Sequence, residues 1–128
     1  MTSHETWALD LNAGPIFLQI GRNVRVLLAR GELHPGEKLP SARDLAQRLG
    51  VNPNTVVHAY RELEAENVIE TKRGLGTFVR EDAPVTAMRQ DLLYSAARSF
   101  AEEIGRLGVP RDEAVAILEE VLHAGETE

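Results

Sequence analysis

The N-terminal half of the chain carries apolar residues at the spacing of an α-helix in three successive segments. The patterns predict helices over residues 15–30, from Ser41 to about Leu49, and from Thr55 to about Glu66. Pro15 suits the first position of a helix, and Ser41 suits the N-cap. Gly31 and Gly50 suit the left-handed turn that follows a helix. The short alternation over residues 7–11 favours a strand or an extended arm.

A turn and a hairpin complete this half of the chain. Residues 51–54, Val-Asn-Pro-Asn, supply a tight turn between the second and third helices, whereas the Pro- and Gly-containing residues 34–40 predict an irregular connector. Two strand-like runs at residues 68–72 and 77–80 are joined by residues 73–76, whose glycines permit the positive φ of a hairpin. The predicted order is therefore helix-turn-helix followed by a β-hairpin, or wing.

Residues 81–84 carry the only linker signal, because two acids and a proline follow the second strand-like run. We therefore predict a winged helix-turn-helix domain over residues 1–82 and a helical region over residues 83–128. The expected fold class is mainly α with a small β-hairpin wing, extended by a C-terminal two-helix dimerisation region.

The C-terminal region predicts two amphipathic helices that lack a partner. One long helix runs to Leu107, and a second follows Gly108 and Pro110, each with an apolar face. Fewer than about 40 residues seldom bury enough surface to be stable unaided, so pairing of two chains is expected. The alternative is that these helices fold back on the first domain and leave a monomer. The residues expected at the dimer interface are Leu93, Ala97, Phe100, Ile104, Leu107, Ile117, Leu118 and Val121.

The second helix of a helix-turn-helix lies in the major groove of DNA and presents its first residues to base edges. The third predicted helix opens with Asn54 and Thr55, which can hydrogen-bond bases, while its N-terminal amides attract phosphate oxygens. Cations near the hairpin tip can reach an adjacent groove. The residues expected to contact DNA are Asn54, Thr55, His58 and Arg61 on one outer face of the helix, and Lys72 and Arg73 on the hairpin.

The net charge of −6 at pH 7 opposes binding to phosphates, but the acidic residues are segregated. Residues 83–128 hold four arginines against nine acidic residues, whereas residues 1–82 hold ten basic residues against eleven acidic ones. Within residues 38–61, four Lys and Arg side chains stand against a single acid, Asp44. A local basic surface therefore remains in the first domain: Lys38, Arg43, Arg48 and Arg61.

The remaining composition argues against several classes of protein. The 128 residues include no cysteine, which excludes disulfides, thiolate catalysis and zinc-finger ligation. The four histidines have no ligand-like spacing, and no phosphate-binding loop or nucleophile motif occurs, so we expect neither an enzyme nor a bound cofactor or metal. No apolar run is long enough for a membrane span, and no signal-peptide pattern occurs, so a cytoplasmic protein is expected.

Three stretches between residues 15 and 80 resemble the GntR family of bacterial transcription regulators. They are residues 33–46 (Leu-His-Pro-Gly-Glu-Lys-Leu-Pro-Ser-Ala-Arg-Asp-Leu-Ala), residues 51–64 (Val-Asn-Pro-Asn-Thr-Val and then Tyr-Arg-Glu-Leu-Glu), and residues 73–79 (Arg-Gly-Leu-Gly-Thr-Phe-Val). The short tail further resembles the YtrA subfamily, through Arg-Leu-Gly-Val at residues 106–109 and Asp-Glu-Ala at residues 112–114.

This resemblance implies a homodimer that binds an inverted-repeat operator in double-stranded DNA. At matching positions it assigns DNA contacts to Arg43, Asn52, Asn54, Thr55, Arg73 and Gly74. Leu75 departs from the basic residue that is frequent there, and Pro53 and Val57 replace arginines of several larger relatives, so the detailed base code of those relatives does not carry over. A small-molecule effector of unknown identity would need a site between subunits, or between tail and first domain.

The leading hypothesis is a sequence-specific transcription regulator, and more specifically a repressor that occludes a promoter as a dimer. The alternative is a winged-helix adaptor that docks another protein without binding DNA, since a fold alone does not determine function. Specific binding to an operator in the presence of competitor DNA favours the regulator, whereas a stoichiometric protein partner without a DNA footprint favours the adaptor.

Overall fold

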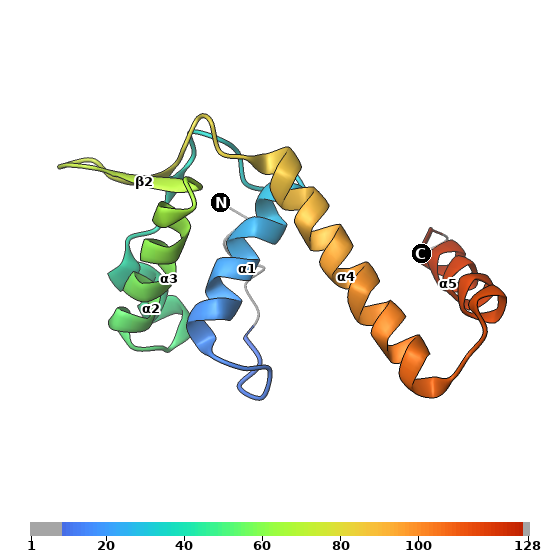
Figure 1. Cartoon of the computed structure of the whole chain (residues 1–128). Coiled ribbons are helices and arrows are strands. Elements are labelled where there is room, and N and C mark those ends of the chain that lie inside the picture. Colours follow the sequence, from blue (N-terminus) through green and yellow to red (C-terminus); the bar gives the residue numbers. More distant parts are fainter. Residues whose placement is uncertain (1–8, 127–128) are drawn as a thin grey trace. The chain divides into compact units, whose positions relative to one another are not determined.

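The computed structural model describes residues 9–126, and this range contains five helices and three short strands (Figure 1). The elements are α1 (Ile16–Ala29), β1 (Lys38–Leu39), α2 (Ala42–Leu49), α3 (Pro53–Ala65), β2 (Ile69–Lys72), β3 (Gly76–Val79), α4 (Val85–Leu107) and α5 (Arg111–Glu126). The predicted fold class, mainly helical with a small β wing, is confirmed.

The chain forms two compact units that divide between Gln90 and Asp91, inside α4. We call them the winged-helix unit and the tail unit. The division falls after the predicted linker at residues 81–84 because Met88, in the first turns of α4, is buried in the core of the winged-helix unit. The assignment of residues 1–82 to DNA binding and of residues 83–128 to pairing stays a prediction.

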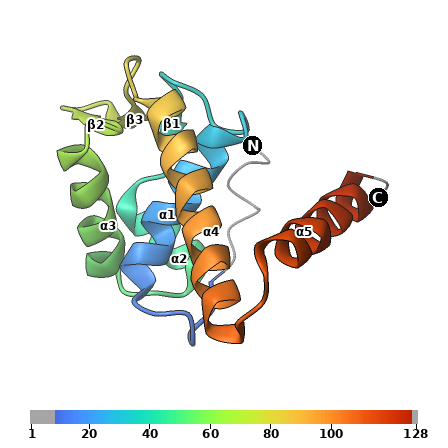
Figure 2. The ribbon, with the colours of Figure 1, turned by 45° about the vertical axis from the view of Figure 1, so that its right-hand side comes forward.

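The winged-helix unit is built around α1, α2 and α3, in which α3 packs against both other helices and the strands lie at one end (Figure 2). Each helix turns an apolar stripe inward, as the sequence pattern predicts. Burial of a leucine or isoleucine side chain stabilises the fold by roughly 1.5–3 kcal/mol, so this cluster carries most of the stability of the unit. The fully buried side chains include Ile20, Val24, Leu28, Leu45, Val56, Leu63 and Val79.

The wing is part of a three-stranded antiparallel sheet in the order β1-β3-β2. The predicted hairpin pairs Ile69 with Val79 and Lys72 with Gly76. The connector at residues 34–40 was expected to be irregular, and this was wrong in part, because it contains β1. A two-residue strand has no alternation to reveal it, and its pairing with β3 joins residues about forty positions apart.

The helix ends lie where the capping signals predict them, except that the starts of α1 and α3 are shifted. Ser41 caps α2 with its Oγ accepting from the Asp44 amide at 3.1 Å, and Gly50 ends that helix in the left-handed conformation. Pro15 is the N-cap of α1 rather than its first helical residue. The third helix begins at Pro53 rather than Thr55, because proline needs no amide partner in a first helical turn.

The extended arm expected over residues 7–11 receives no support in the part that the structure describes. Leu9 and Asp10 are irregular, and Leu11 lies in a turn that the Ala13 amide closes by bonding the Asp10 carbonyl at 3.0 Å. Residues 7 and 8 lie outside the described residues. Leu9 instead packs on the edge of the hydrophobic core.

Candidate nucleic-acid interface

The start of α3 is held by Asn52, whose Oδ1 accepts a hydrogen bond from the Asn54 amide at 2.8 Å. The capping role uses this side-chain oxygen, so a DNA contact from Asn52 would come from its amide nitrogen. Asn54 is exposed and Thr55 is half-buried in the first helical turn. The sequence placed this pair at the helix start, as the structure does. The expected attraction of phosphate by free N-terminal amides is wrong for this turn, because Pro53 has no N–H and the amides of Asn54 and Thr55 bond the Oδ1 and the carbonyl oxygen of Asn52.

Arg43 is the second residue of α2, two positions after the Ser41 cap, and is exposed. The buried residues of this helix are Leu45 and Ala46, so Arg43 stays outside the core. A guanidinium group can contact two phosphate oxygens at once. The helix therefore presents a cation from the outer surface of the same unit that carries α3.

The wing tip is a turn over residues 73–75, closed by a 2.8 Å hydrogen bond from the Leu75 amide to the Lys72 carbonyl. Gly74 has a φ of 78°, which a side chain would strain. Arg73 and Leu75 are exposed beside it, and the wing projects beyond α2 and α3 in Figure 1. The tip therefore offers one guanidinium group, a backbone that DNA can approach closely, and an apolar side chain.

Two lysines flank one aromatic ring on the sheet. The Nζ of Lys72 lies 4.8 Å from the centre of the Phe78 ring, and the Nζ of Lys38 lies 5.9 Å from it. An ammonium group over a ring face is held by cation–π attraction. Lys38 pairs with Phe78 in the β1–β3 register, which sequence reasoning missed because it did not predict β1.

His58 and Arg61, expected on one face of α3, have different surroundings. The His58 ring stacks on Phe17 of α1, with ring centres 3.8 Å apart and planes at 10°, and its Nε2 lies 3.6 Å from a Glu62 carboxylate oxygen. Arg61 instead lines a groove beside the sheet. His58 is thus tied to α1, whereas Arg61 stands on the side of α3 that faces the wing.

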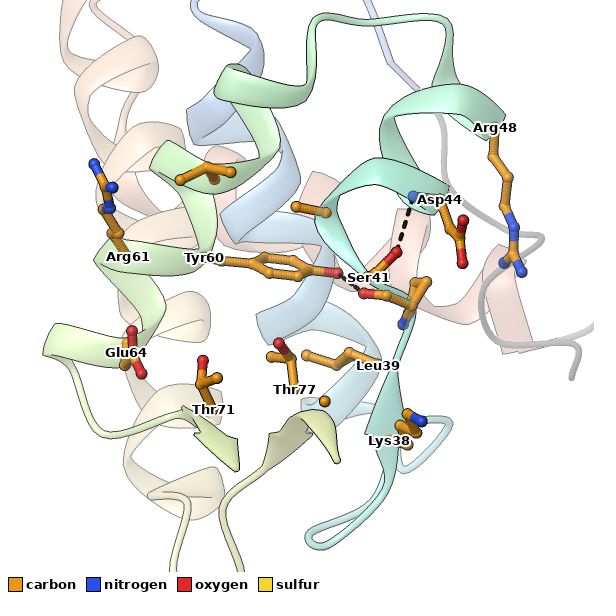
Figure 3. Close-up of a pocket in the computed structure, with 14 residues that line it drawn as sticks. Lys38, Leu39, Ser41, Asp44, Arg48, Tyr60, Arg61, Glu64, Thr71 and Thr77 are labelled. Carbon is orange, nitrogen blue, oxygen red and sulfur yellow. Dashed lines mark hydrogen bonds between the residues drawn. The ribbon is translucent and has the colours of Figure 1, made fainter. Parts of the chain in front are cut away.

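A groove of about 650 Å³ lies between α2, α3 and the sheet (Figure 3). The hydroxyl of Tyr60 donates a 2.8 Å hydrogen bond to the Pro40 carbonyl and joins α3 to the segment before α2. Burial raises the pKa of Tyr60, and the positive charge of Arg48 acts in the opposite direction. The phenol therefore stays neutral and keeps this wall of the groove in place.

The histidine and carboxylate side chains give no metal centre in the part of the chain that the structure describes. Within residues 9–126 no three His, Asp or Glu groups come together in a way that could hold an ion. In the same range no helix is long and apolar enough to cross a membrane. The chemistry of the surface is that of cations, amides and hydroxyls around α2, α3 and the wing.

Residues 17–79, which run from the second residue of α1 to the last residue of β3, match the sequence profile of the bacterial regulatory proteins of the gntR family. A solved GntR-family transcriptional regulator from Listeria monocytogenes superposes with a TM-score of 0.80 at 32% identity, covering 88% of this chain and 98% of that one. The chain belongs to the GntR family. The members it resembles are transcription regulators and not enzymes.

Two further GntR relatives bear on function. The HTH-type transcriptional repressor YtrA of Bacillus subtilis is 50% identical over 72 residues, which are 56% of this chain and 55% of YtrA. The DNA-binding domain of AraR, solved in complex with operator ORX1, superposes with a TM-score of 0.50 at 27% identity, covering 56% of this chain and 86% of that one. The expected relationship to YtrA is confirmed, and the chain spans about half of YtrA's length.

Proposed function

We propose that this GntR-family chain is a sequence-specific DNA-binding repressor that acts as a homodimer on an inverted-repeat operator in the cytoplasm. The observation that carries the proposal is the common exposure of three elements on one compact unit: the first turn of α3, the first turn of α2 and the wing tip. These elements offer side-chain hydrogen-bonding groups and cations, which are the groups that bind phosphates and base edges.

The DNA contacts of the proposal keep the positions expected from the sequence. The first turn of α3 reads bases in the major groove through Asn54 and Thr55, and Arg43 binds the phosphate backbone from α2. The wing tip, with Arg73 and Gly74, enters the adjacent minor groove. The similarity to an AraR domain bound to its operator supports this arrangement. Asn52, His58, Arg61 and Lys72 complete the set of proposed contacts.

The dimer of the proposal is supported by the apolar surface of the tail unit. In α4, Leu93 is 65% exposed and Leu107 is 66% exposed. In α5 only Ala114 is buried, while Ile117, Leu118 and Val121 are exposed. Exposed apolar side chains of this number mark an interaction site, and a second copy of the same helices offers a matching apolar face. The remaining proposed contacts are Ala97, Phe100 and Ile104.

Pairing through the tail also suits the distribution of charge. Residues 83–128 carry −5 of the net charge of −6, so a dimer joined there keeps most of its net negative charge on elements other than those that approach phosphate. Two half-sites bound together add their free energies, which turns two weak modules into a specific binder. The repressor role rests on similarity to YtrA, whose name states that function.

The proposal is tested by fluorescence anisotropy of the full chain against DNA fragments from the neighbourhood of its own gene. We expect a specific site that survives excess competitor DNA at about 0.15 M salt, with an affinity roughly 10³-fold or more above that for unrelated DNA. A protein that binds no fragment specifically contradicts the proposal. If such a protein copurifies with a stoichiometric protein partner, the adaptor is the better explanation.

A further inference from the structure

The groove beside the sheet has two walls that come from the two proposed DNA-reading elements. One wall is α3, through Val57, Arg61 and Glu64, and the other is the sheet, through Thr71 and Thr77. Residues of α2, among them Asp44 and Arg48, also line the groove (Figure 3). Polar side chains from α2, α3 and the sheet line the groove.

The position of this protein groove determines where a DNA strand would run when α3 lies in the major groove of a duplex and the wing lies in the adjacent minor groove. A major groove and its adjacent minor groove are separated by one sugar-phosphate strand. If α3 lies in the first and the wing tip in the second, that strand must pass between α3 and the sheet. The space between them in this structure is the groove of about 650 Å³.

Three cations surround this space. Arg61 stands on α3, Arg48 on α2 and Lys38 on β1, and all three are exposed. Figure 3 draws Arg48 and Arg61 on opposite sides of Tyr60, with Lys38 at the edge of the sheet. The sequence placed Lys38 and Arg48 in the basic surface of the first domain but did not assign DNA contacts to them. The hydroxyls of Ser41, Thr71 and Thr77 line the same space and can donate to phosphate oxygens.

We infer that this groove seats the sugar-phosphate strand between the major and minor grooves, and that Lys38 and Arg48 are phosphate-binding residues. The inference rests on the proposed function, since it needs α3 and the wing on one duplex. Asp44 and Glu64 also line the groove, so their carboxylates repel the same strand and hold the affinity below its maximum.

The test measures the salt dependence of operator binding by the full-length Lys38→Gln and Arg48→Gln variants. One lost phosphate contact lowers the slope of log K against log salt by about 0.9, and a dimer loses two. We therefore expect the ratio of the wild-type to the variant association constant to fall by about twelvefold between 50 and 200 mM salt. Operator and unrelated DNA should weaken alike, because phosphate contacts carry no sequence information.

Two further variants separate groove contacts from general effects of charge and folding. Arg98→Gln removes a charge from an exposed position of α4 in the tail unit and should leave the slope unchanged. Glu64→Gln removes a repulsive charge from the groove wall and should tighten binding. If Lys38→Gln and Arg48→Gln give the same affinity and salt slope as Arg98→Gln, the groove inference is overturned and the proposed function stands. If the wild-type chain binds no operator, the proposed function itself fails.

Discussion

A chain carrying Leu93→Glu is expected to be monomeric and to lose about 10²- to 10⁴-fold of its operator affinity. Leu93 is 65% exposed in the single chain, so the substitution removes little packing that the monomer needs. In the proposed dimer the same position is covered by a second copy, and a buried carboxylate without a partner costs several kcal/mol. The molar mass in sedimentation equilibrium and the operator Kd by anisotropy measure both effects.

Ser95→Glu is the matched control for this prediction. Ser95 lies two residues further along α4, which turns it by about 200° from Leu93, and it is exposed. The control adds the same charge to the same helix and should leave the protein dimeric. Should Leu93→Glu and a second variant, Leu107→Glu, both remain dimeric with wild-type operator affinity, pairing through this face of the tail is refuted.

Replacing Arg43 or Arg73 with alanine is expected to weaken operator binding on the order of 100-fold or more in each case. A hydrogen bond to a charged group contributes about 1.5–3 kcal/mol, and a symmetric dimer loses two such contacts. Arg43 lies outside the core and Arg73 is exposed at the wing tip, so neither variant should lower the thermal midpoint appreciably. Anisotropy gives the affinity, and circular dichroism during heating gives the midpoint.

The two arginines should differ in what they do to specificity. A phosphate contact from Arg43 supports every sequence equally, whereas Arg73 in a narrow minor groove responds to groove width and hence to A·T content. Arg43→Ala should therefore weaken operator and unrelated DNA to the same extent, and Arg73→Ala should also reduce the ratio between them. Arg98→Ala, at an exposed position of the tail unit, is the control. If Arg43→Ala and Arg73→Ala bind the operator as tightly as this control, neither arginine contacts DNA.

Local signals in the sequence were enough to predict most of the fold. Ser41 and Gly50 mark the two ends of α2, and the glycines at 74 and 76 mark the hairpin, because capping and positive φ depend on one or two neighbouring residues. Pattern reasoning failed for β1, whose two residues are a strand only by pairing with β3. It also placed the start of α3 too late, because Pro53 was taken as part of the turn.

The candidate site was likewise predictable only where it depends on neighbouring residues in the sequence. The start of α3 and the wing tip are each a single continuous segment of the sequence, so Asn54 and Arg73 could be proposed as DNA contacts from local patterns alone. The groove could not, because Lys38, Arg48 and Arg61 meet around it from three elements, and the position of Lys38 depends on the unpredicted strand. Nor could the helical spacing of His58 reveal its stack on Phe17, which depends on how α1 packs against α3.

The central claim is that two joined chains place their α3 helices in successive major grooves on one face of an operator. It is tested most directly by inserting about five base pairs, half a helical turn, between the half-sites, because this moves the second half-site to the opposite face of the duplex. The account predicts that the wild-type chain loses its high-affinity complex of two chains per duplex and regains affinity when about ten base pairs are inserted. Equal affinity for the parent, five-pair and ten-pair operators would contradict it.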